Sequence, residues 1–497
     1  MMFSRAAAVA LLAALSACAV GPDFQRPAPP AASDYGTAPL KGETASVEGT
    51  AGNAQRFVAD MDIPAQWWAL FQSPKLTKLV EEALKKNPNI DAAQAALRQS
   101  HELYLAQKAS FFPVVQGGLG ASRAGVASSA IANPTVSTTS TYSLYTAQLS
   151  LSYSPDVFGG TRRSVEAAKA QVEASRFQLE ATYLTLSSNV VVAAVQEALY
   201  RDLIATTQKT LELQHRLTET VRAQKEIGTA SNLDLLTQES AEAQTAATLP
   251  PLQKQLGQTR DALTALLGRL PSGEPAETFQ LDELTLPSDL PVSLPSKVVE
   301  HRPDVRQAEE NLHVASAEVG VAVANLLPQF TLSGDTGSAA LRISQLFGAG
   351  NGFWDLGASL TQTLFDAGAL LHKRRAAVAA LDQAGAQYRS AVVLACQNVA
   401  DTLRALQADA DALKASAQAD RAAKTTLDTA SRQYKLGTIS LVAVINAELV
   451  FEQTELALVQ ARVNRYLDTA ALFQALGGGW WNRSGESLNE QPRSARE

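Results

Sequence analysis

The nine residues YTAQLSLSY, numbered 145–153, alternate strictly between apolar and polar side chains. A period of two is typical of a β-strand with one apolar and one polar face. After seven intervening residues begins a run of 67 residues, Thr161 to Ile227, that contains neither Gly nor Pro. As one helix this run would be about 100 Å long at 1.5 Å per residue, too long for an ordinary globular domain. The pattern therefore predicts strands joined to very long helices in a tubular assembly.

The second half of the chain repeats landmarks of the first half in the same order and at matching spacing. Asn87-Pro88-Asn89 corresponds to Arg302-Pro303-Asp304, and Gly228-Thr229-Ala230-Ser231 corresponds to Gly437-Thr438-Ile439-Ser440. A second run almost free of Gly and Pro, Ala369 to Leu436, corresponds to the first one. The chain is therefore expected to contain two structural repeats.

Each repeat is expected to contain a short helix, two strands, a long helix and a further helix. Repeat 1 is placed at 65–271 and repeat 2 at 297–479, with a linker at 272–296 and a tail at 480–497. The expected strands are about 114–124, 143–154, 329–338 and 354–365, and the expected longer helices are 161–227, 229–267, 369–436 and 438–476. Pro250-Pro251 is expected to kink or interrupt the helix at 229–267.

The chain begins with the features of a secreted lipoprotein. Arg5 precedes an apolar run too short to span a bilayer, which is typical of a signal peptide at residues 1–17. Small residues directly before Cys18 resemble a lipobox, in which the Cys receives diacylglycerol and an N-acyl chain; the alternative is an ordinary signal peptide with an incidental Cys. Ala19, in place of Asp, resembles lipoproteins sorted to the outer membrane. Residues 18–64 are expected to form a lipidated N-terminus and an extended linker.

Charge and motif content argue against several classes of protein. The formal net charge of −7, from 42 basic and 49 acidic residues, argues against a nucleic-acid binder. The five histidines show no metal-ligand spacing, and the sequence holds no GxSxG or Walker motif. We therefore expect no enzyme, no cofactor and no metal, apart from the covalent lipid at Cys18.

The four expected strands raise a problem of closure. Each is about ten residues long, the length that crosses a bilayer as a tilted barrel strand. Hydrocarbon leaves no partner for free backbone groups, so a spanning sheet must close, and four strands cannot close around a usable lumen. A homotrimer would supply a 12-stranded barrel that continues into a long α-helical barrel. A hairpin exposed to water would show the same local pattern.

Several motifs carry a family resemblance over nearly all of the chain after the signal. The segment CAVGPDFQRP at 18–27 resembles the start of mature NodT-type outer-membrane efflux lipoproteins. LFDAG at 364–368, and YKLGT at 434–438 followed by Ala443–Ala447, resemble TolC-like channels. The resemblance implies a trimeric outer-membrane barrel on a periplasmic helical tube, anchored by lipid in a Gram-negative cell. It also implies two partners, a periplasmic adaptor protein and an inner-membrane pump of the RND type.

The resemblance further implies a gate at the periplasmic end of the helices. Gly228 and Gly437 are expected to form the tip turns there. Asp234 matches a family Asp that contacts a Tyr, here Tyr434, so a contact between these two side chains is expected. Two further gate positions, which are acidic in the family, are Ala443 and Asn446 here.

The function expected from these observations is passive export of small molecules, such as drugs and toxic compounds, received from the inner-membrane pump. Two alternatives stay open. One is an outer-membrane duct for type I protein secretion, which has the same fold. The other is a structural periplasmic lipoprotein whose hairpins stay in water and form no channel.

Overall fold

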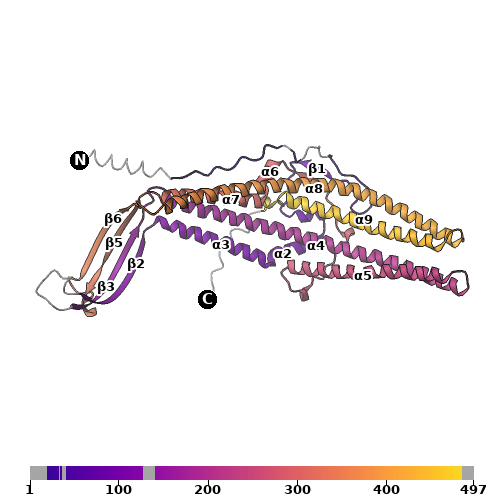
Figure 1. Cartoon of the computed structure of the whole chain (residues 1–497), viewed down its shortest axis with the longest axis horizontal. Coiled ribbons are helices and arrows are strands. Elements are labelled where there is room, and N and C mark those ends of the chain that lie inside the picture. The colour runs from indigo at the N-terminus through magenta and orange to yellow at the C-terminus, as the bar shows by residue number, and fades with distance from the viewer. Residues whose placement is uncertain (1–19, 33, 36–40, 127–139, 484–497) are drawn as a thin grey trace. The chain divides into compact units, whose positions relative to one another are not determined.

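The computed structural model describes residues 20–32, 34–35, 41–126 and 140–483 (Figure 1). The expected signal peptide, Cys18 and the last part of the expected tail lie outside these residues. The described chain divides into two compact units. The first contains the start of the chain to Arg26 with residues 97–175 and 308–388, and the second contains residues 27–96, 176–307 and the C-terminal part from Arg389.

The first unit contains a four-stranded antiparallel sheet with the order β2-β3-β5-β6 (Figure 1). Its strands are β2 (Val114–Val126), β3 (Ser140–Tyr153), β5 (Gln329–Ala340) and β6 (Gly352–Thr361). Each repeat supplies one adjacent pair, and β3 pairs with β5 from Tyr145↔Ala340 to Tyr153↔Leu332. The sequence pattern had placed the last strand at 354–365, so β6 begins two residues earlier and ends four residues earlier.

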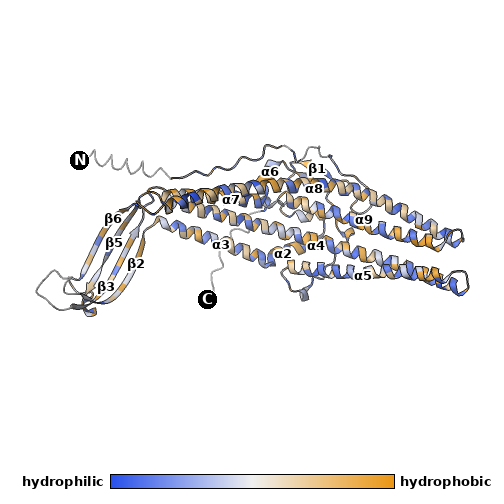
Figure 2. Cartoon of the chain, in the orientation of Figure 1, coloured by the Kyte–Doolittle hydropathy of each residue, from blue (hydrophilic) through white to orange (hydrophobic). Residues whose placement is uncertain are grey.

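The sheet has one apolar and one polar face, as the alternation along its strands in Figure 2 shows. Register pairs on the apolar face include Leu119↔Ala147 and Gly334↔Leu356. Leu119 is 85% exposed and Leu356 is 78% exposed. Among the described residues, the outer strands β2 and β6 each have a neighbouring strand on one side only. The sheet of one chain therefore presents a broad apolar face and two free edges.

A capping aspartate begins each long helix directly after a strand. Asp156 accepts hydrogen bonds from the backbone N–H groups of Thr161 and Arg162, both at 2.9 Å, at the start of α4 (Gly160–Glu226). Asp366 accepts from the backbone N–H groups of Gly368 (2.9 Å) and Leu370 (2.7 Å) at the start of α8 (Ala369–Lys435). Carboxylates at these positions satisfy free donors and complement the helix dipole. The helix α4 begins and ends one residue earlier than the expected helix 161–227, and α8 ends one residue earlier than the expected helix 369–436.

The remaining helices occur as matching pairs in the two repeats. They are α2 (Pro74–Lys86) and α6 (Pro295–His301), α3 (Pro88–Lys108) and α7 (Pro303–Ala324), and α5 (Asn232–Leu266) and α9 (Leu441–Ala475). Within the described residues, no helix combines the length and apolar character needed to cross a membrane.

The helix α5 runs without interruption through Pro250 and Pro251. The expected interruption is therefore wrong, whereas the alternative expectation of a kink at these prolines stays a prediction. Proline removes one intrahelical hydrogen-bond donor and crowds the preceding turn, but a long helix tolerates this where neighbouring contacts hold it. Both α5 and α9 begin three residues later than expected, because Ser231 and Ser440 take the N-cap positions.

Part of the expected N-terminal linker is an ordered element of the second unit. Strand β1 (Arg56–Ala59) pairs in parallel with β4 (Asp289–Val292) in the linker between the repeats. Arg465 on α9 is fully buried beside this sheet. Its guanidinium donates to oxygen atoms of Thr44, Ala51, Asn53 and Gln55. The expectation of a linker without partners is therefore wrong for residues 44–59, because the buried Arg465 and strand β4 hold them in place.

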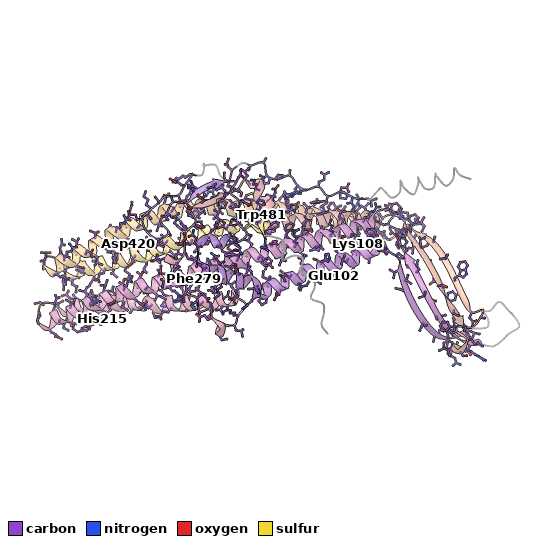
Figure 3. The ribbon with its side chains drawn as sticks, turned by 180° about the vertical axis from the view of Figure 1, so that it is seen from behind. Glu102, Lys108, His215, Phe279, Asp420 and Trp481 are labelled. Carbon is purple, nitrogen blue, oxygen red and sulfur yellow. The ribbon has the colours of Figure 1, made fainter. Side chains whose placement is uncertain are left out.

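Aromatic side chains form the core around this small sheet. Trp67 stacks on Phe473 with ring centroids 5.4 Å apart, and Phe71 packs against Tyr466. Phe279, from the linker between the repeats, is also fully buried (Figure 3). This core joins the N-terminal segment, the linker and α9, which are far apart in the sequence.

Candidate functional site at the hairpin tips

Two helical hairpins of the second unit, α4–α5 and α8–α9, turn at glycines in the left-handed region. Gly228 has φ +78° and Gly437 has φ +71°. A Cβ added to either glycine would meet no other atom within 4 Å. The need for glycine at these positions therefore comes from the backbone angle and not from crowding.

The two turns have the same hydrogen-bond pattern, a Schellman C-cap. The backbone bonds run from Gly228 N to Lys225 O (3.0 Å), Thr229 N to Gln224 O (2.8 Å), Gly437 N to Tyr434 O (2.9 Å) and Thr438 N to Gln433 O (3.0 Å). The expected tip turns are thus found at the expected residues. Their role at the periplasmic end of a channel stays a prediction.

The helices that follow the turns are capped differently. Ser231 Oγ accepts from the N–H of Asp234 at 3.0 Å, and an Asp234 carboxylate oxygen accepts from the N–H of Ser231 at 2.9 Å. These reciprocal bonds form a capping box. The Ser231 hydroxyl also donates to the Asp234 carboxylate at 2.7 Å, and this bond first, followed by the backbone bond, lowers the pKa of Asp234. The matching residues of the second hairpin are Ser440 and Ala443, and in the described structure Ser440 makes no side-chain capping bond.

The expected contact between Asp234 and Tyr434 is not formed within the chain. The Tyr434 hydroxyl donates instead to Gln224 Oε1 at 2.7 Å. Asp234 is occupied by the capping box, because the third helical position is the one that reaches the N-cap N–H. Its charge still reaches Tyr434: burial first, and then the Asp234 carboxylate, raise the pKa of the Tyr434 hydroxyl.

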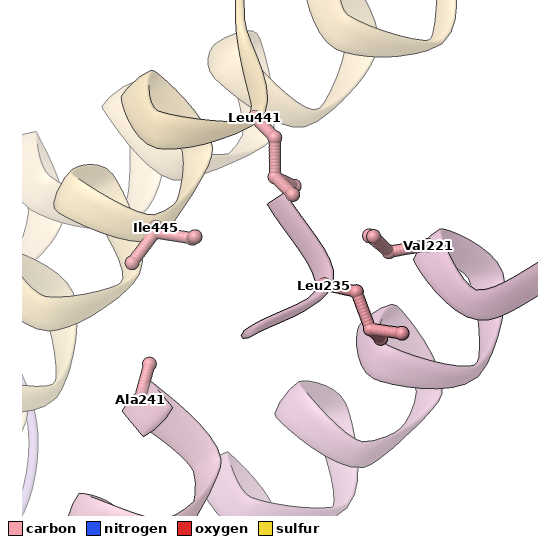
Figure 4. Packing of buried hydrophobic residues seen from close by; sticks show 5 residues of the cluster. All are labelled: Val221, Leu235, Ala241, Leu441 and Ile445. Atoms are coloured by element: carbon pink, nitrogen blue, oxygen red, sulfur yellow. The ribbon is translucent and has the colours of Figure 1, made fainter. Parts of the chain in front are cut away.

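A small apolar cluster packs the two hairpins together near their turns (Figure 4). Val221 of α4 and Leu235 of α5 meet Leu441 and Ile445 of α9, with the aromatic ring of Tyr434 against the same cluster. These apolar contacts place Gln224 and Tyr434 beside each other. A change in the packing of the two hairpins would therefore also disturb their hydrogen bond.

The other two expected gate positions lie outside this cluster. Ala443 and Asn446 are both exposed on α9. Polar side chains on the first hairpin pair with each other. Arg222 contacts Glu239 at 2.9 Å, and His215, labelled in Figure 3, contacts Glu242 at 2.9 Å. The tip surface of one chain is therefore polar around two uncharged positions.

A polar seam inside the hairpins was missed by sequence reasoning. Gln214 and Gln238 are almost fully buried, and the Gln238 amide donates to the Gln214 carbonyl at 3.3 Å. Thr245 donates to Glu452 of α9 at 3.2 Å, and Glu448 lies one turn before Glu452. The signal was present in the sequence, because polar residues at 238 and 245 continue the spacing of three and four residues that marks a buried helix face.

Within the described ranges, no group of three or more His, Cys, Asp or Glu residues is arranged to hold a metal ion. Cys18, the expected lipidation site, lies outside the described residues. The candidate site therefore consists of two tight turns between helices. After the first turn, α5 begins with a side-chain capping box, and after the second turn, α9 begins without a side-chain cap.

Comparison with known proteins agrees with this architecture. A family model described as outer membrane efflux protein matches residues 79–269 and 294–478, which are two separate segments. The toluene efflux pump outer membrane protein TtgC of Pseudomonas putida is 28% identical over 483 residues, covering 96% of each chain. The pyoverdine export outer membrane protein OpmQ of Pseudomonas putida is 30% identical, covering 84% of this chain and 88% of OpmQ.

A solved structure shows the same fold. The outer-membrane channel OprN aligns with a TM-score of 0.82 and 28% identity, covering 93% of this chain and all of the OprN chain. The chain therefore belongs to the outer membrane efflux protein family. The resemblance inferred from the sequence motifs is confirmed.

Proposed function

We propose that the chain is the exit duct of a tripartite efflux system in the outer membrane of a Gram-negative cell. Three copies would join their sheets into a 12-stranded barrel, which continues into a tube built from the long helices. Small molecules would pass through this duct from an inner-membrane RND-type pump, delivered through a periplasmic adaptor. The pump would supply the energy, and this chain would conduct passively.

The observation that carries the proposal is the two-faced, open-edged sheet. Strands β2 and β6 have free edges, and side chains such as Leu119 and Leu356 are exposed on the apolar face. Such a sheet in water would be a site of aggregation. In lipid, the apolar face would contact hydrocarbon, and pairing β2 of one copy with β6 of the next would satisfy both edges.

The names of the relatives support the transport role. TtgC is named as part of a toluene efflux pump, and OpmQ is named for pyoverdine export. For this chain we propose a lipid anchor at Cys18 and a gate at the helical tips, which includes Asp234, Tyr434, Ala443, Asn446 and the two turn glycines. The same arrangement needs no catalytic residue.

The test places one lysine on each face of the same sheet. Leu119→Lys, on the apolar face, is expected to prevent assembly and channel activity, because Lys at the bilayer midplane costs about 2–4 kcal/mol. Gln148→Lys, on the polar face, is the matched control and is expected to assemble and conduct. The measurements are single-channel recordings in planar bilayers and the mass of the unboiled complex in SDS.

Two outcomes would contradict the proposal. One is a wild-type chain that stays monomeric and shows no conductance. The other is a Leu119→Lys variant that assembles and conducts like the Gln148→Lys control, because a sheet in water would accept both lysines.

A further inference from the structure

The segment directly after Cys18 lies against two helices in the first unit. We call residues Val20–Arg26 the N-terminal strap. The Val20 N–H donates to the carbonyl of Phe158 at 3.1 Å. Phe158 lies between the end of β3 at Tyr153 and the start of α4 at Gly160. The strap therefore begins at the place where the chain leaves the sheet and enters a long helix.

A buried arginine holds the first half of the strap. The Arg163 side chain on α4 is only 5% exposed. Its guanidinium donates to the Val20 carbonyl at 3.2 Å and to the Asp23 carboxylate at 2.5 Å. A third bond reaches Glu166 at 2.7 Å. A buried guanidinium needs such partners, so the strap satisfies donors that would otherwise be left without acceptors.

Two glycines let the strap approach the helix closely. A Cβ on Gly21 would lie 2.4 Å from the Gly320 Cα of α7, and Gly21 has φ +95°. A Cβ on Gly320 would lie 2.7 Å from Arg163 Cγ and 3.0 Å from the Val20 carbonyl oxygen. Glycine inside a helix is destabilising by roughly 1 kcal/mol relative to alanine. The close approach of the strap is a physical reason for glycine at this position.

The second half of the strap is held by α7. The Phe24 ring stacks on His313 with centroids 4.2 Å apart and an interplanar angle of 11°. Arg26 contacts Glu309 at 2.9 Å, and the Glu309 side chain is only 4% exposed. The strap thus has contacts along its length with α4 of the first repeat and α7 of the second.

We propose that the surface of α4 and α7 in contact with the N-terminal strap is a binding site for it. By holding the strap, this site fixes the point where the lipid anchor enters the membrane. Only one residue, Ala19, separates Cys18 from Val20, so the chain allows their Cα atoms to be at most about 7 Å apart. The acyl chains would be held beside the junction of sheet and helices, where a barrel would leave the bilayer. The lipid-placing role rests on the proposed function, whereas the docking of the strap does not.

Protein contacts, rather than the lipid, hold the strap in this site. A lipid alone would tether the N-terminus to the membrane but would leave its position along the protein free. A released segment of seven residues would spread over about 15 Å as a flexible chain. The docked strap removes this freedom, so Arg163 and Gly320 act as positioning residues.

The experiment measures the position of the strap by electron paramagnetic resonance. Nitroxide labels are placed at Gln25→Cys and Glu318→Cys in the mature full-length protein with Cys396→Ser. Both labelled residues are exposed. The docked strap is expected to give one narrow distance distribution. Arg163→Ala and Gly320→Ala are each expected to broaden it toward the 15 Å spread of a free segment.

The exposed Lys169→Ala variant on the same helix is the matched control, because in the described structure Lys169 makes no hydrogen bond or ion pair with the strap. It is expected to keep the narrow distribution. A Cys18→Ser variant exported with an ordinary signal peptide is expected to keep it too. A broad distribution in the wild type, or a narrow one in both Arg163→Ala and Gly320→Ala, would overturn the docking site.

The lipid-placing role has its own readout. A narrow distribution that is lost in Cys18→Ser would show that the lipid holds the strap, which contradicts the inference. Intact-mass measurement reports separately whether Cys18 is acylated. An unacylated protein with a docked strap would remove the lipid-placing role, and an assembled channel with a free strap would leave the proposed function standing.

Discussion

Asp335 of β5 and Asp355 of β6 lie directly opposite each other on the polar face of the sheet. Ser150 on the neighbouring strand β3 donates a 2.5 Å hydrogen bond to the Asp335 carboxylate. Among the described residues of that face, no Lys or Arg accompanies the two carboxylates. Directly opposed like charges destabilise an antiparallel pair of strands. This pair therefore lowers the stability of the sheet, and a role in folding alone does not account for it.

We predict that this pair makes the duct selective for cations. In a trimer the polar faces would line the lumen, and six carboxylates without nearby bases would attract cations. The double variant Asp335→Asn, Asp355→Asn is expected to move the reversal potential in a salt gradient toward zero. The exposed Glu102→Gln change on α3 removes one negative charge per chain outside the sheet and serves as the control. A cation preference that survives the double variant would rule out this assignment.

A second prediction concerns the capping difference between the hairpins. Asp234→Ala removes a capping box, and Ala443→Asp offers Ser440 the same partner that Ser231 has. Loss of a cap typically destabilises a helix start by about 1 kcal/mol. We expect amide exchange in the first turn of α5 to speed up roughly fivefold in Asp234→Ala. Exchange in the first turn of α9 should slow in Ala443→Asp, and no change in either variant would refute the capping account.

A third prediction separates the two candidate partners of Tyr434. Tyr434→Phe and Gln224→Ala each break the observed hydrogen bond, which we expect to contribute about 1 kcal/mol. The double variant should then be no worse than the larger single effect. If the bond also helps to close the tip, both variants should raise the conductance of the resting channel. The opposite result would be that the stability losses of Tyr434→Phe and Gln224→Ala add, while those of Tyr434→Phe and Asp234→Ala do not. That result would favour a contact between Tyr434 and Asp234 instead.

A fourth prediction concerns acid stability of the hairpins. Burial, and secondarily the charge of Glu452, raise the pKa of Glu448 to about 7. The folded state therefore binds this proton more tightly than the unfolded state, whose pKa is near 4.5. The contribution of Glu448 to stability is full below about pH 4.5 and is lost as pH rises to about 7.

Glu448→Gln keeps a neutral side chain of the same shape at every pH. We expect its melting temperature to exceed that of the wild type at pH 8 and to equal it near pH 4.5. Glu102→Gln, at an exposed site, is the matched control and should leave the difference between the two pH values unchanged. A Glu448→Gln variant that is less stable than the wild type at pH 8 would show that the charged form is required.

The sequence predicted the strands and long helices because their signals are local. Alternation along 145–153 and a Gly- and Pro-free run at 161–227 require only the chain itself. The expected starts of α5 and α9 are three residues too early. The turn glycine marks the end of the preceding helix, but the serine N-cap sets the start of the next one. Pro250 and Pro251 do not interrupt α5, which continues through both exposed prolines.

The candidate site was predictable in position but not in detail. Gly228 and Gly437 follow from the backbone angle that a tight helical turn needs. The partner of Tyr434 does not, because it depends on how two hairpins pack through Leu235 and Ile445. The pairing of β1 with β4 and the burial of Arg465 were equally out of reach, since four-residue strands carry almost no periodic signal.

The parallel ladder between β1 and β4 makes the two halves of the chain interlock. The first half carries β1 and Gln55, while the second carries β4 and Thr469, which accepts a 3.1 Å hydrogen bond from the Gln55 amide. A protease that nicked the chain after Gly273 would therefore leave both fragments attached. The same contacts would allow the protein to be assembled from two separately produced polypeptides.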